Sequence, residues 1–353
     1  MKIRRTEHLK AKPDLDGPLG FGQYFTDHMA TAYYRGLEQG WEEPEIVPYG
    51  PFSLDPAASV LHYGQAIFEG MKAFKQEDGR VVLFRPAFNW QRMKKSAERL
   101  CMEFLDEESF IQAIADLVRL DHAWIPTRPG ASLYIRPTLL GIEPFLGVRP
   151  SNRYLFYVIL SPVGAYYREG WSPLRIWVEQ EYLRAAPGGL GETKAAANYA
   201  GSLKAAQRAK EKGFSQVLWL DVSRQYIEEV GTMNVFFVFA DEVVTPQLSG
   251  TILGGGMRDA VLTILREWDL PVRERQLSLN EILQGQRSGR LKEAFGTGTA
   301  AVISPIGELA MNDTTLQING GKTGELAARL YEEIVGIQMG RVMDRHRWLM
   351  ALN

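Results

Sequence analysis

The chain has 353 residues, 45% of them hydrophobic, and its formal charge at pH 7 is −2. This length allows a large buried core and predicts two domains rather than one. The small net charge excludes a global field that would draw the protein to nucleic acid or to an anionic membrane surface. The composition therefore predicts a globular, enzyme-sized α/β or α+β protein, with no nucleic acid and no membrane among its partners.

The sequence also predicts a cytoplasmic location. Cys101 is the only cysteine, so no internal disulfide can form, and this fits a reducing compartment. Residues 1–17 are polar and contain no apolar segment of a secretory signal. No stretch approaches the roughly 20 apolar residues that a membrane-spanning helix needs.

The first half of the chain predicts strands and helices in mixed order. Residues 52–85 have the pattern of short strands and turns. Pro86 favours a helix over 87–104, because its missing N–H costs nothing at the first helical position. Apolar residues recur there at helical spacing, which places Cys101 among the packed residues of that helix. The further predicted elements are a helix over 108–120 and strands over 131–140, 153–163 and 174–180.

The second half begins with a Gly/Pro-rich loop over 185–194, which leads into a predicted helix and then into a meander of short strands. This mixture of antiparallel meanders and helices predicts an α+β fold. The predicted domains are a smaller one over 1–167 and a larger one over 181–353, connected by 168–180. The later predicted elements are helices over about 195–212, 279–284 and 323–340, a glycine-rich loop and helix over 248–268, and a short strand that ends at 296–306.

Lys194 is the first residue that suggests chemistry. It lies between the glycine-rich loop and a run of small residues, KAAANYAGS (194–202), which leaves room for a flat ring to approach closely. A lysine amine in a partly desolvated pocket has a lowered pKa and can attack a carbonyl. Taken alone, a lysine is more often a solvated surface residue.

A pair of glutamates, Glu228 and Glu229, lies in the predicted strand YIEEV. Successive residues of a strand point to opposite faces, so one carboxylate faces the core side, where an unpaired charge is costly. A protonated pyridine nitrogen beside it would satisfy that charge. The alternative is a solvated pair near a strand end.

Three segments offer groups for a phosphate. ILGGGMRDAV (252–261) brings glycines into a helix start, where backbone N–H groups and the helix dipole favour an anion. GTGTAAV (296–302) offers backbone donors and hydroxyls in a compact turn. Arg92 is a candidate fixed cation. A plain glycine turn with a helix cap and an ordinary surface arginine are the alternatives.

Other chemistries have little support in the sequence. The five histidines show no paired spacing for a metal, so no metal site is predicted. There is no G-x-S-x-G motif. Aromatic residues are not interleaved with basic runs as in RNA-binding modules.

Taken together, these segments resemble the branched-chain aminotransferases, pyridoxal-phosphate enzymes with the D-amino-acid-aminotransferase-like fold. The resemblance extends from about residue 45 to 340 and implies a cofactor at the domain interface, bound mainly by the larger domain. The stretches that carry it are LHYGQAIFEGMKAF (61–74), LFRPAFNWQRM (83–93), LYIRPTLLG (133–141), SPVGAYY (161–167), KAAANYAGSL (194–203), VLWLD (217–221), EEVGTMNVFFV (228–238) and FGTGTAAVISPI (295–306).

The resemblance implies roles for individual residues. Lys194 matches the lysine that forms a Schiff base with pyridoxal 5′-phosphate, Tyr199 the tyrosine near the phenolate oxygen, and Glu229 the carboxylate that faces the ring nitrogen. The matches to phosphate ligands are Arg92, Thr299 and the backbone at Gly256 and Met257. The matches to substrate-pocket positions are Tyr63, Phe68, Tyr134, Arg136, Tyr166, Thr232 and Ala300. Val148 matches a residue lent to the neighbouring subunit, which implies a homodimer or a higher homo-oligomer.

The chain departs from the family pattern at two places. LGGGMR (253–258) replaces the usual L-P-G-[IV]-T-R, so Met257 stands where a threonine hydroxyl is common. The C-x-x-C pair of animal members falls on Ala301 and Ser304, so that thiol switch cannot operate.

The implied reaction is the reversible transfer of the amino group of L-leucine, L-isoleucine or L-valine to 2-oxoglutarate, giving L-glutamate. Lys194 would act as the general base, and Arg136 would turn toward the γ-carboxylate of glutamate. D-amino-acid aminotransferases and aminodeoxychorismate lyases of the same fold remain alternatives, as does an inactive binding or scaffold homologue. The aromatic residues of the LHY and GAYY segments, together with EVGTMN, favour the branched-chain enzyme.

Overall fold

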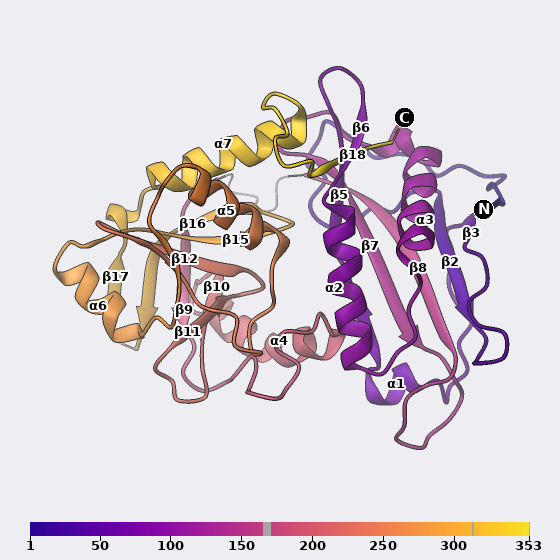
Figure 1. The fold of residues 1–353 in the computed structure, drawn as a ribbon, viewed down its shortest axis with the longest axis horizontal. Helices are drawn as coiled ribbons and strands as arrows, with labels where there is room; N and C mark the ends of the chain where they lie inside the picture. The colour runs from indigo at the N-terminus through magenta and orange to yellow at the C-terminus, as the bar shows by residue number, and fades with distance from the viewer. Residues whose placement is uncertain (165–170, 313, 353) are drawn as a thin grey trace. The chain divides into compact units, whose positions relative to one another are not determined.

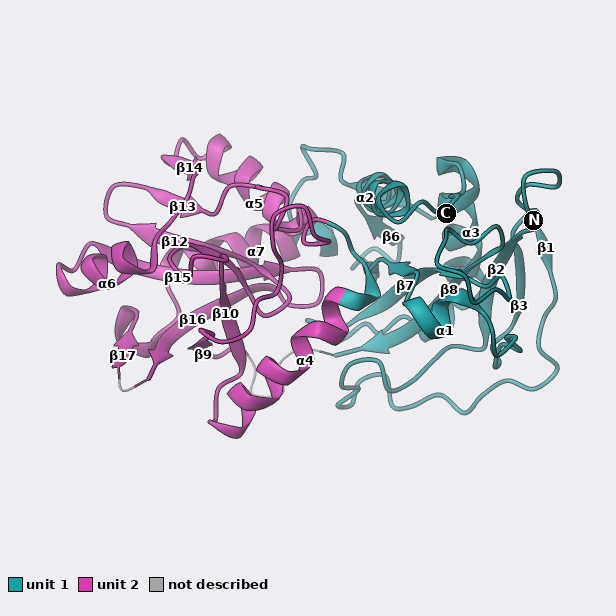
Figure 2. Ribbon diagram, turned by 90° about the horizontal axis from the view of Figure 1, so that it is seen from below, with its two compact units in different colours: residues 1–168, 193–197, 336–353 teal, residues 169–192, 198–335 magenta. Residues whose placement is uncertain are grey.

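The computed structural model describes residues 1–164, 171–312 and 314–352, and the chain forms two compact units (Figures 1 and 2). Within the described residues, unit 1 comprises 1–164, 193–197 and 336–352, and unit 2 comprises 171–192, 198–312 and 314–335. The sequence predicts an uninterrupted second domain over 181–353. The structure instead groups 193–197 and 336–352 with unit 1, because these segments pair with its strands, as Ala195 does with Ile67.

Unit 1 is built on one sheet whose strands follow the order β1-β3-β2-β8-β7-β5-β6-β18, with β4 paired to β7. All neighbours are antiparallel except β1 and β3. The strands are β1 (Lys2–Ile3), β2 (His28–Tyr34), β3 (Glu45–Pro48), β4 (Ala66–Phe68), β5 (Met71–Lys75), β6 (Val81–Phe84), β7 (Ser132–Gly141), β8 (Tyr154–Val163) and β18 (Leu349–Ala351).

Helices α2 and α3 pack on this sheet and on each other (Figure 1). Pro86 occupies the first turn of α2, as predicted, and the Asp106 carboxylate caps α3 by accepting from Ser109 N at 2.8 Å. Apolar faces of both helices join a core that includes Met93, Phe110 and Phe156. The helices of this unit are α1 (Ser59–Tyr63), α2 (Pro86–Arg99), α3 (Glu107–Leu120) and the 3₁₀ turn η1 (His122–Trp124).

The prediction for Cys101 is wrong. Helix α2 ends at Arg99, and Cys101 follows with a φ of 52° and an exposed side chain. The apolar spacing continues beyond Arg99, but Leu100 already forms the C-cap. A second difference concerns 52–85, where the sequence predicts only strands and turns and the structure contains the short helix α1.

Unit 2 is built on a mixed sheet whose strands follow the order β11-β10-β9-β16-β15-β12-β13-β14, with β17 paired to β16. Strand β9 runs parallel to both of its neighbours, and β13 runs parallel to β14. The strands are β9 (Leu174–Val178), β10 (Gln216–Leu220), β11 (Ile227–Val230), β12 (Asn234–Phe239), β13 (Val243–Thr245), β14 (Val272–Glu274), β15 (Leu291–Gly298), β16 (Val302–Met311) and β17 (Thr314–Gln317). The α+β class predicted from the sequence is confirmed.

The helices of unit 2 bury apolar faces against the same sheet. Ala205 and Ala209 of α4 pack on Val217 and Trp219, and α5 contacts β15 and β14. The helices are α4 (Ala196–Glu211), α5 (Gly256–Glu267), α6 (Leu279–Arg287), α7 (Glu325–Met339) and the 3₁₀ turn η2 (Asn319–Gly321); α4 starts and α7 ends with residues of unit 1. The segment predicted as one short strand ending at 296–306 is a hairpin, with β15 and β16 joined by residues 299–301.

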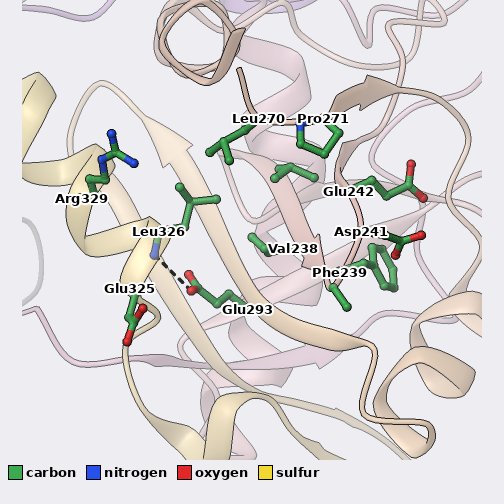
Figure 3. A pocket seen from close by; sticks show the side chains of 12 residues that line it. Val238, Phe239, Asp241, Glu242, Leu270, Pro271, Glu293, Glu325, Leu326 and Arg329 are labelled. Atoms are coloured by element: carbon green, nitrogen blue, oxygen red, sulfur yellow. Dashed lines mark hydrogen bonds between the residues drawn. The ribbon is translucent and has the colours of Figure 1, made fainter. Parts of the chain in front are cut away.

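Helix α7 begins beside a pocket of about 350 Å³ in unit 2, shown in Figure 3. The Glu293 carboxylate accepts from Leu326 N and Ala327 N, both at 3.1 Å, and so caps the helix start. Arg329 lines the same pocket, and its guanidinium lies 3.6 Å from the centre of the Trp268 ring. None of the described candidate site residues lines this pocket. Within the described part of the chain, no helix is long and apolar enough to cross a membrane.

Candidate functional site

The candidate residues are divided between the two units. Unit 1 contains Tyr63, Phe68, Arg92, Tyr134, Arg136, Val148 and Lys194. Unit 2 contains Tyr199, Glu229, Thr232, Gly256, Met257, Thr299 and Ala300. Tyr166 lies outside the described residues. Among the described residues, no group of three or more His, Cys, Asp or Glu side chains could hold a metal ion.

Lys194 is fixed by its backbone to elements far away in the sequence. Its N–H donates to Ser96 Oγ of α2 at 3.0 Å, and its carbonyl accepts from Phe68 N of β4 at 3.2 Å. Ala195 continues this pairing as a bridge to Ile67. The Lys194 ammonium lies 4.9 Å from the centre of the Phe68 ring. These bonds fix the backbone of Lys194 to helix α2 and strand β4 of unit 1.

Glu69 follows β4 directly and is completely buried. The Arg92 guanidinium forms a bidentate ion pair with the Glu69 carboxylate, with Nε 2.7 Å from Oε1 and Nη2 2.8 Å from Oε2. Asn89 Nδ2 donates to the same carboxylate at 2.7 Å. Burial raises the pKa of Glu69, but the charges of Arg92 and Lys194 and the bonds from Arg92 and Asn89 outweigh burial, so the pKa is lowered. Arg92, predicted as a phosphate ligand, is therefore held by a buried carboxylate.

Phe68, Tyr134 and Arg136 form one cluster. Arg136 Nη2 donates to Tyr134 Oη at 3.1 Å, and the Arg136 guanidinium lies 4.7 Å from the Phe68 ring centre and 5.2 Å from the Tyr134 ring centre. Lys72 faces Tyr134 across the β5–β7 pair, and burial lowers the pKa of Lys72 to about 8. The cluster thus combines aromatic surface with a cation, which suits a side chain that is apolar in one substrate and anionic in another.

Tyr63 and Val148 lie toward the surface. Tyr63 ends helix α1 and is 45% exposed, and its hydroxyl donates to the carbonyl of Leu146. Val148, in the loop after β7, is 87% exposed. An apolar side chain with this exposure makes little contact within its own chain.

Glu229 lies on β11, and its side chain is 5% exposed. Its Oε1 accepts from Leu253 N at 2.8 Å and lies 3.1 Å from Arg184 Nη2. Glu228 is buried as well, and its Oε1 accepts from Thr251 Oγ1. Burial raises the pKa of Glu228. Both glutamates are therefore inside unit 2, and the alternative of a solvated pair is excluded.

Helix α5 begins at Gly256, with Gly255 as its N-cap and no side chain capping it. Helix starts are places where anions commonly bind, because of their backbone N–H groups and the helix dipole. A Cβ at Gly255 would overlap with Asn234 Oδ1, whose side-chain amide also donates to Leu253 O at 2.8 Å. Met257 is 5% exposed, so its side chain packs inward while its backbone belongs to the first turn.

The other candidates of unit 2 lie on turns and on α4. Thr232 is exposed in the turn between β11 and β12. Thr299 and Ala300 are half-buried in the turn between β15 and β16, and Tyr199 is half-buried on α4. A backbone turn, a helix start and the buried carboxylate of Glu229 are thus the structural features of these candidates. These groups fit a phosphorylated pyridine ring.

Sequence reasoning missed Glu69 and Arg184. Glu69 stands alone among apolar and aromatic residues, and a single acid in such a run is a signal for a buried, paired carboxylate. Arg184 directly precedes the Gly/Pro-rich loop and has no comparable local signal.

Comparison with known proteins gives consistent matches. The model of the class IV amino-transferase family matches residues 66–309. Branched-chain-amino-acid aminotransferase 2 of Bacillus subtilis (strain 168) is 52% identical over 349 residues, covering 99% of this chain and 96% of that protein. Branched-chain-amino-acid transaminase 1 of the same strain is 49% identical over 351 residues, covering 99% and 98%.

Solved structures match as well. The branched-chain amino acid aminotransferase of Escherichia coli has a TM-score of 0.78 at 26% identity, covering 92% of this chain and 99% of that one. A second structure of the Escherichia coli enzyme has a TM-score of 0.74 at 27% identity, again covering 92% and 99%.

Proposed function

This chain belongs to the class IV aminotransferases and, within them, to the branched-chain-amino-acid aminotransferases, and we propose that its cofactor is pyridoxal 5′-phosphate and its substrates are L-leucine, L-isoleucine and L-valine. It is therefore an enzyme of the transferase class. The amino group would pass reversibly to 2-oxoglutarate, giving the branched 2-oxo acid and L-glutamate. The observation that carries the proposal is the 52% identity over 99% of the chain. The backbone bond of Lys194 to Ser96 supports it.

Several residues would hold the cofactor. Lys194 would bind it covalently through its amine, Glu229 would face its ring nitrogen, and Tyr199 would lie near its phenolate oxygen. The first turn of α5 at Gly256 and Met257, with Thr299 and Arg92, would hold the phosphate. When bound, the cofactor draws electrons from the substrate's Cα and makes the Cα–H bond acidic.

Two residues would handle protons. The Lys194 amine, once the substrate has displaced it from the cofactor, would take the proton from Cα and deliver it to the cofactor. The backbone bonds of Lys194 to Ser96 and Phe68 hold the base of its side chain in place for this transfer. The Glu229 carboxylate would hold a proton at the ring nitrogen. Its burial and its bonds to Leu253 N and Arg184 keep the carboxylate in one orientation.

Substrate side chains would meet the cluster of Phe68, Tyr134 and Arg136. Phe68 and Tyr134 offer an apolar wall to a branched chain. Arg136 would bind the γ-carboxylate when glutamate is the substrate. The further residues proposed to contact the substrate are Tyr63, Thr232, Ala300 and Tyr166. In the homodimer that we propose, Val148 of a second copy would contact the substrate side chain.

An activity panel tests this proposal. The purified protein with added pyridoxal 5′-phosphate is given L-leucine, L-isoleucine, L-valine, D-alanine or aminodeoxychorismate, with 2-oxoglutarate as acceptor for the amino acids. The three branched L-amino acids should yield glutamate, and the other two compounds should react far more slowly. Preferred turnover of D-alanine or of aminodeoxychorismate would reassign the chain within its fold, and no turnover would favour an inactive homologue.

The substitution Gly255→Ala should weaken cofactor binding about tenfold or more, equivalent to about 1.4 kcal/mol. The added Cβ would overlap with Asn234 Oδ1 and shift the start of α5, where the phosphate would bind. Titration of the cofactor-free protein with pyridoxal 5′-phosphate, followed by absorbance, measures the Kd. Gly201→Ala on α4 is the control, because a Cβ there meets nothing within 4 Å. An unchanged Kd for Gly255→Ala would argue against this phosphate site.

A further inference from the structure

One buried arginine, Arg184, connects three segments of unit 2. Its Nη2 lies 3.1 Å from Glu229 Oε1, donates to Gly191 O at 2.9 Å and donates to Thr251 O. The side chain is 8% exposed. Gly191 and Thr251 approach so closely that a Cβ at Gly191 would overlap with the Thr251 carbonyl.

We propose that Arg184 is a positioning residue that keeps the Glu229 carboxylate ionised and fixed, and so determines whether the cofactor's ring nitrogen holds its proton. The proposal rests on the function proposed above and adds a residue to it. Arg184 would not touch the substrate, because it acts through Glu229.

The charges around Glu229 explain why a cation is needed there. Glu229 shares strand β11 with Glu228, a second buried carboxylate, and Asp221 follows the neighbouring strand β10. Arg184 is a cation beside both glutamates. Without it, Glu229 would keep the bond from Leu253 N but lose its ion pair. Loss of a neighbouring cation raises the proton affinity of a buried carboxylate, so the proton between Glu229 and the ring nitrogen would move to the carboxylate and leave that nitrogen unprotonated.

The backbone contacts of Arg184 add a geometric consequence. Gly191 stands in the loop that leads to Lys194, and Thr251 precedes Leu253, whose N–H donates to Glu229. The same guanidinium therefore fixes the loop before the lysine, the segment before helix α5 and the carboxylate between them. A planar guanidinium can serve several acceptors in one plane, which a lysine ammonium does only with looser geometry.

The test compares Arg184→Met and Arg184→Lys, each alone and combined with Glu229→Gln, in the cofactor-loaded enzyme. ¹⁵N NMR of cofactor labelled at the ring nitrogen reports whether that nitrogen is protonated, and leucine kinetics give kcat and KM. Arg184→Met should remove the ring proton and lower kcat about 10- to 100-fold with little change in KM. Losses of this size are typical when a residue that orients a functional group is removed, as is known for the residues that orient metal ligands. Arg184→Lys should keep the ring proton and restore part of kcat.

The double variant distinguishes positioning from general structure. If Arg184 acts through Glu229, Arg184→Met should add little to the loss caused by Glu229→Gln, because residues that act together are not additive. Arg290→Met, which breaks the exposed pair with Asp241, is the matched control and should change neither readout. The proposal would be overturned if Arg184→Met lowered kcat equally in the unmodified enzyme and in Glu229→Gln. A ring nitrogen that is still protonated in Arg184→Met would overturn it as well.

Two further results are decisive. If Arg184→Met does not fold, Arg184→Lys decides, since loss of the ring proton despite the retained charge would contradict the proposed role. Absence of transamination in the unmodified enzyme would instead overturn the proposed function itself, which separates the two failures.

Discussion

Replacing Lys194 by alanine should reduce transamination by a factor of the order of 10⁴ and remove the visible absorbance of the bound cofactor. The amine is the group that would both bind the cofactor and move the Cα proton, so no other side chain replaces either task. The fold should persist, because the anchors to Ser96 and Phe68 are backbone bonds that alanine retains.

The measurement combines an absorbance spectrum with glutamate formation from 2-oxoglutarate and L-leucine. Lys204→Ala on α4 serves as the control, since this lysine is exposed on the helix that follows Lys194. Full activity and unchanged colour in Lys194→Ala would assign the cofactor to a different lysine. Circular dichroism should be the same for both variants and the parent.

The substitution Arg92→Met should lower the free energy of unfolding by about 3–5 kcal/mol at neutral pH, the usual cost of leaving a buried charge without its partner. Glu69 is completely buried, and Arg92 grips both of its oxygens. The double variant Arg92→Met with Glu69→Met should recover most of this loss, because it removes the stranded carboxylate as well.

The pH dependence of this effect has a definite sign. The pKa of Glu69 in the folded protein is lowered from its ordinary 4.5, so the pair stabilises the fold above that pH and the stabilisation is lost as pH falls through the folded pKa. In Arg92→Met, burial prevails and Glu69 takes up a proton more readily. The difference in the free energy of unfolding between the parent and Arg92→Met should therefore become smaller in acid. Urea unfolding at about pH 7 and about pH 4 measures this free-energy difference, and an equal difference at both pH values would contradict this account.

The sequence predicts the parts of the site that have local signals. Lys194 stands beside small residues, and Gly255 and Gly256 enter a helix, so each is visible in a short window of sequence. The α+β class follows from the alternation of meanders and helices. The tandem of Glu228 and Glu229 predicts one buried carboxylate, and only the family resemblance assigns Glu229. The structure buries both glutamates.

The missing parts depend on contacts between distant residues. Glu69 is stabilised by Arg92 and Asn89 on the helix that follows it, and Arg184 by carbonyls of two separate loops. The periodicity of apolar residues in the sequence does not predict such pairs. The prediction for Cys101 fails because apolar spacing continues past Arg99, whereas the chain leaves the helix at Leu100. The hairpin of β15 and β16 is mistaken for one strand because its glycines and threonines resemble a loop.

The assembly of unit 1 from separate segments has a consequence for synthesis on the ribosome. Strand β18 pairs with β6, and Leu352 is buried in the core of unit 1. Unit 2 comprises described residues only up to 335, so its sheet can be complete while unit 1 still lacks this strand. The unit made first is thus finished last, and until then the edge of its sheet at β6 lacks its partner strand and can pair with other chains.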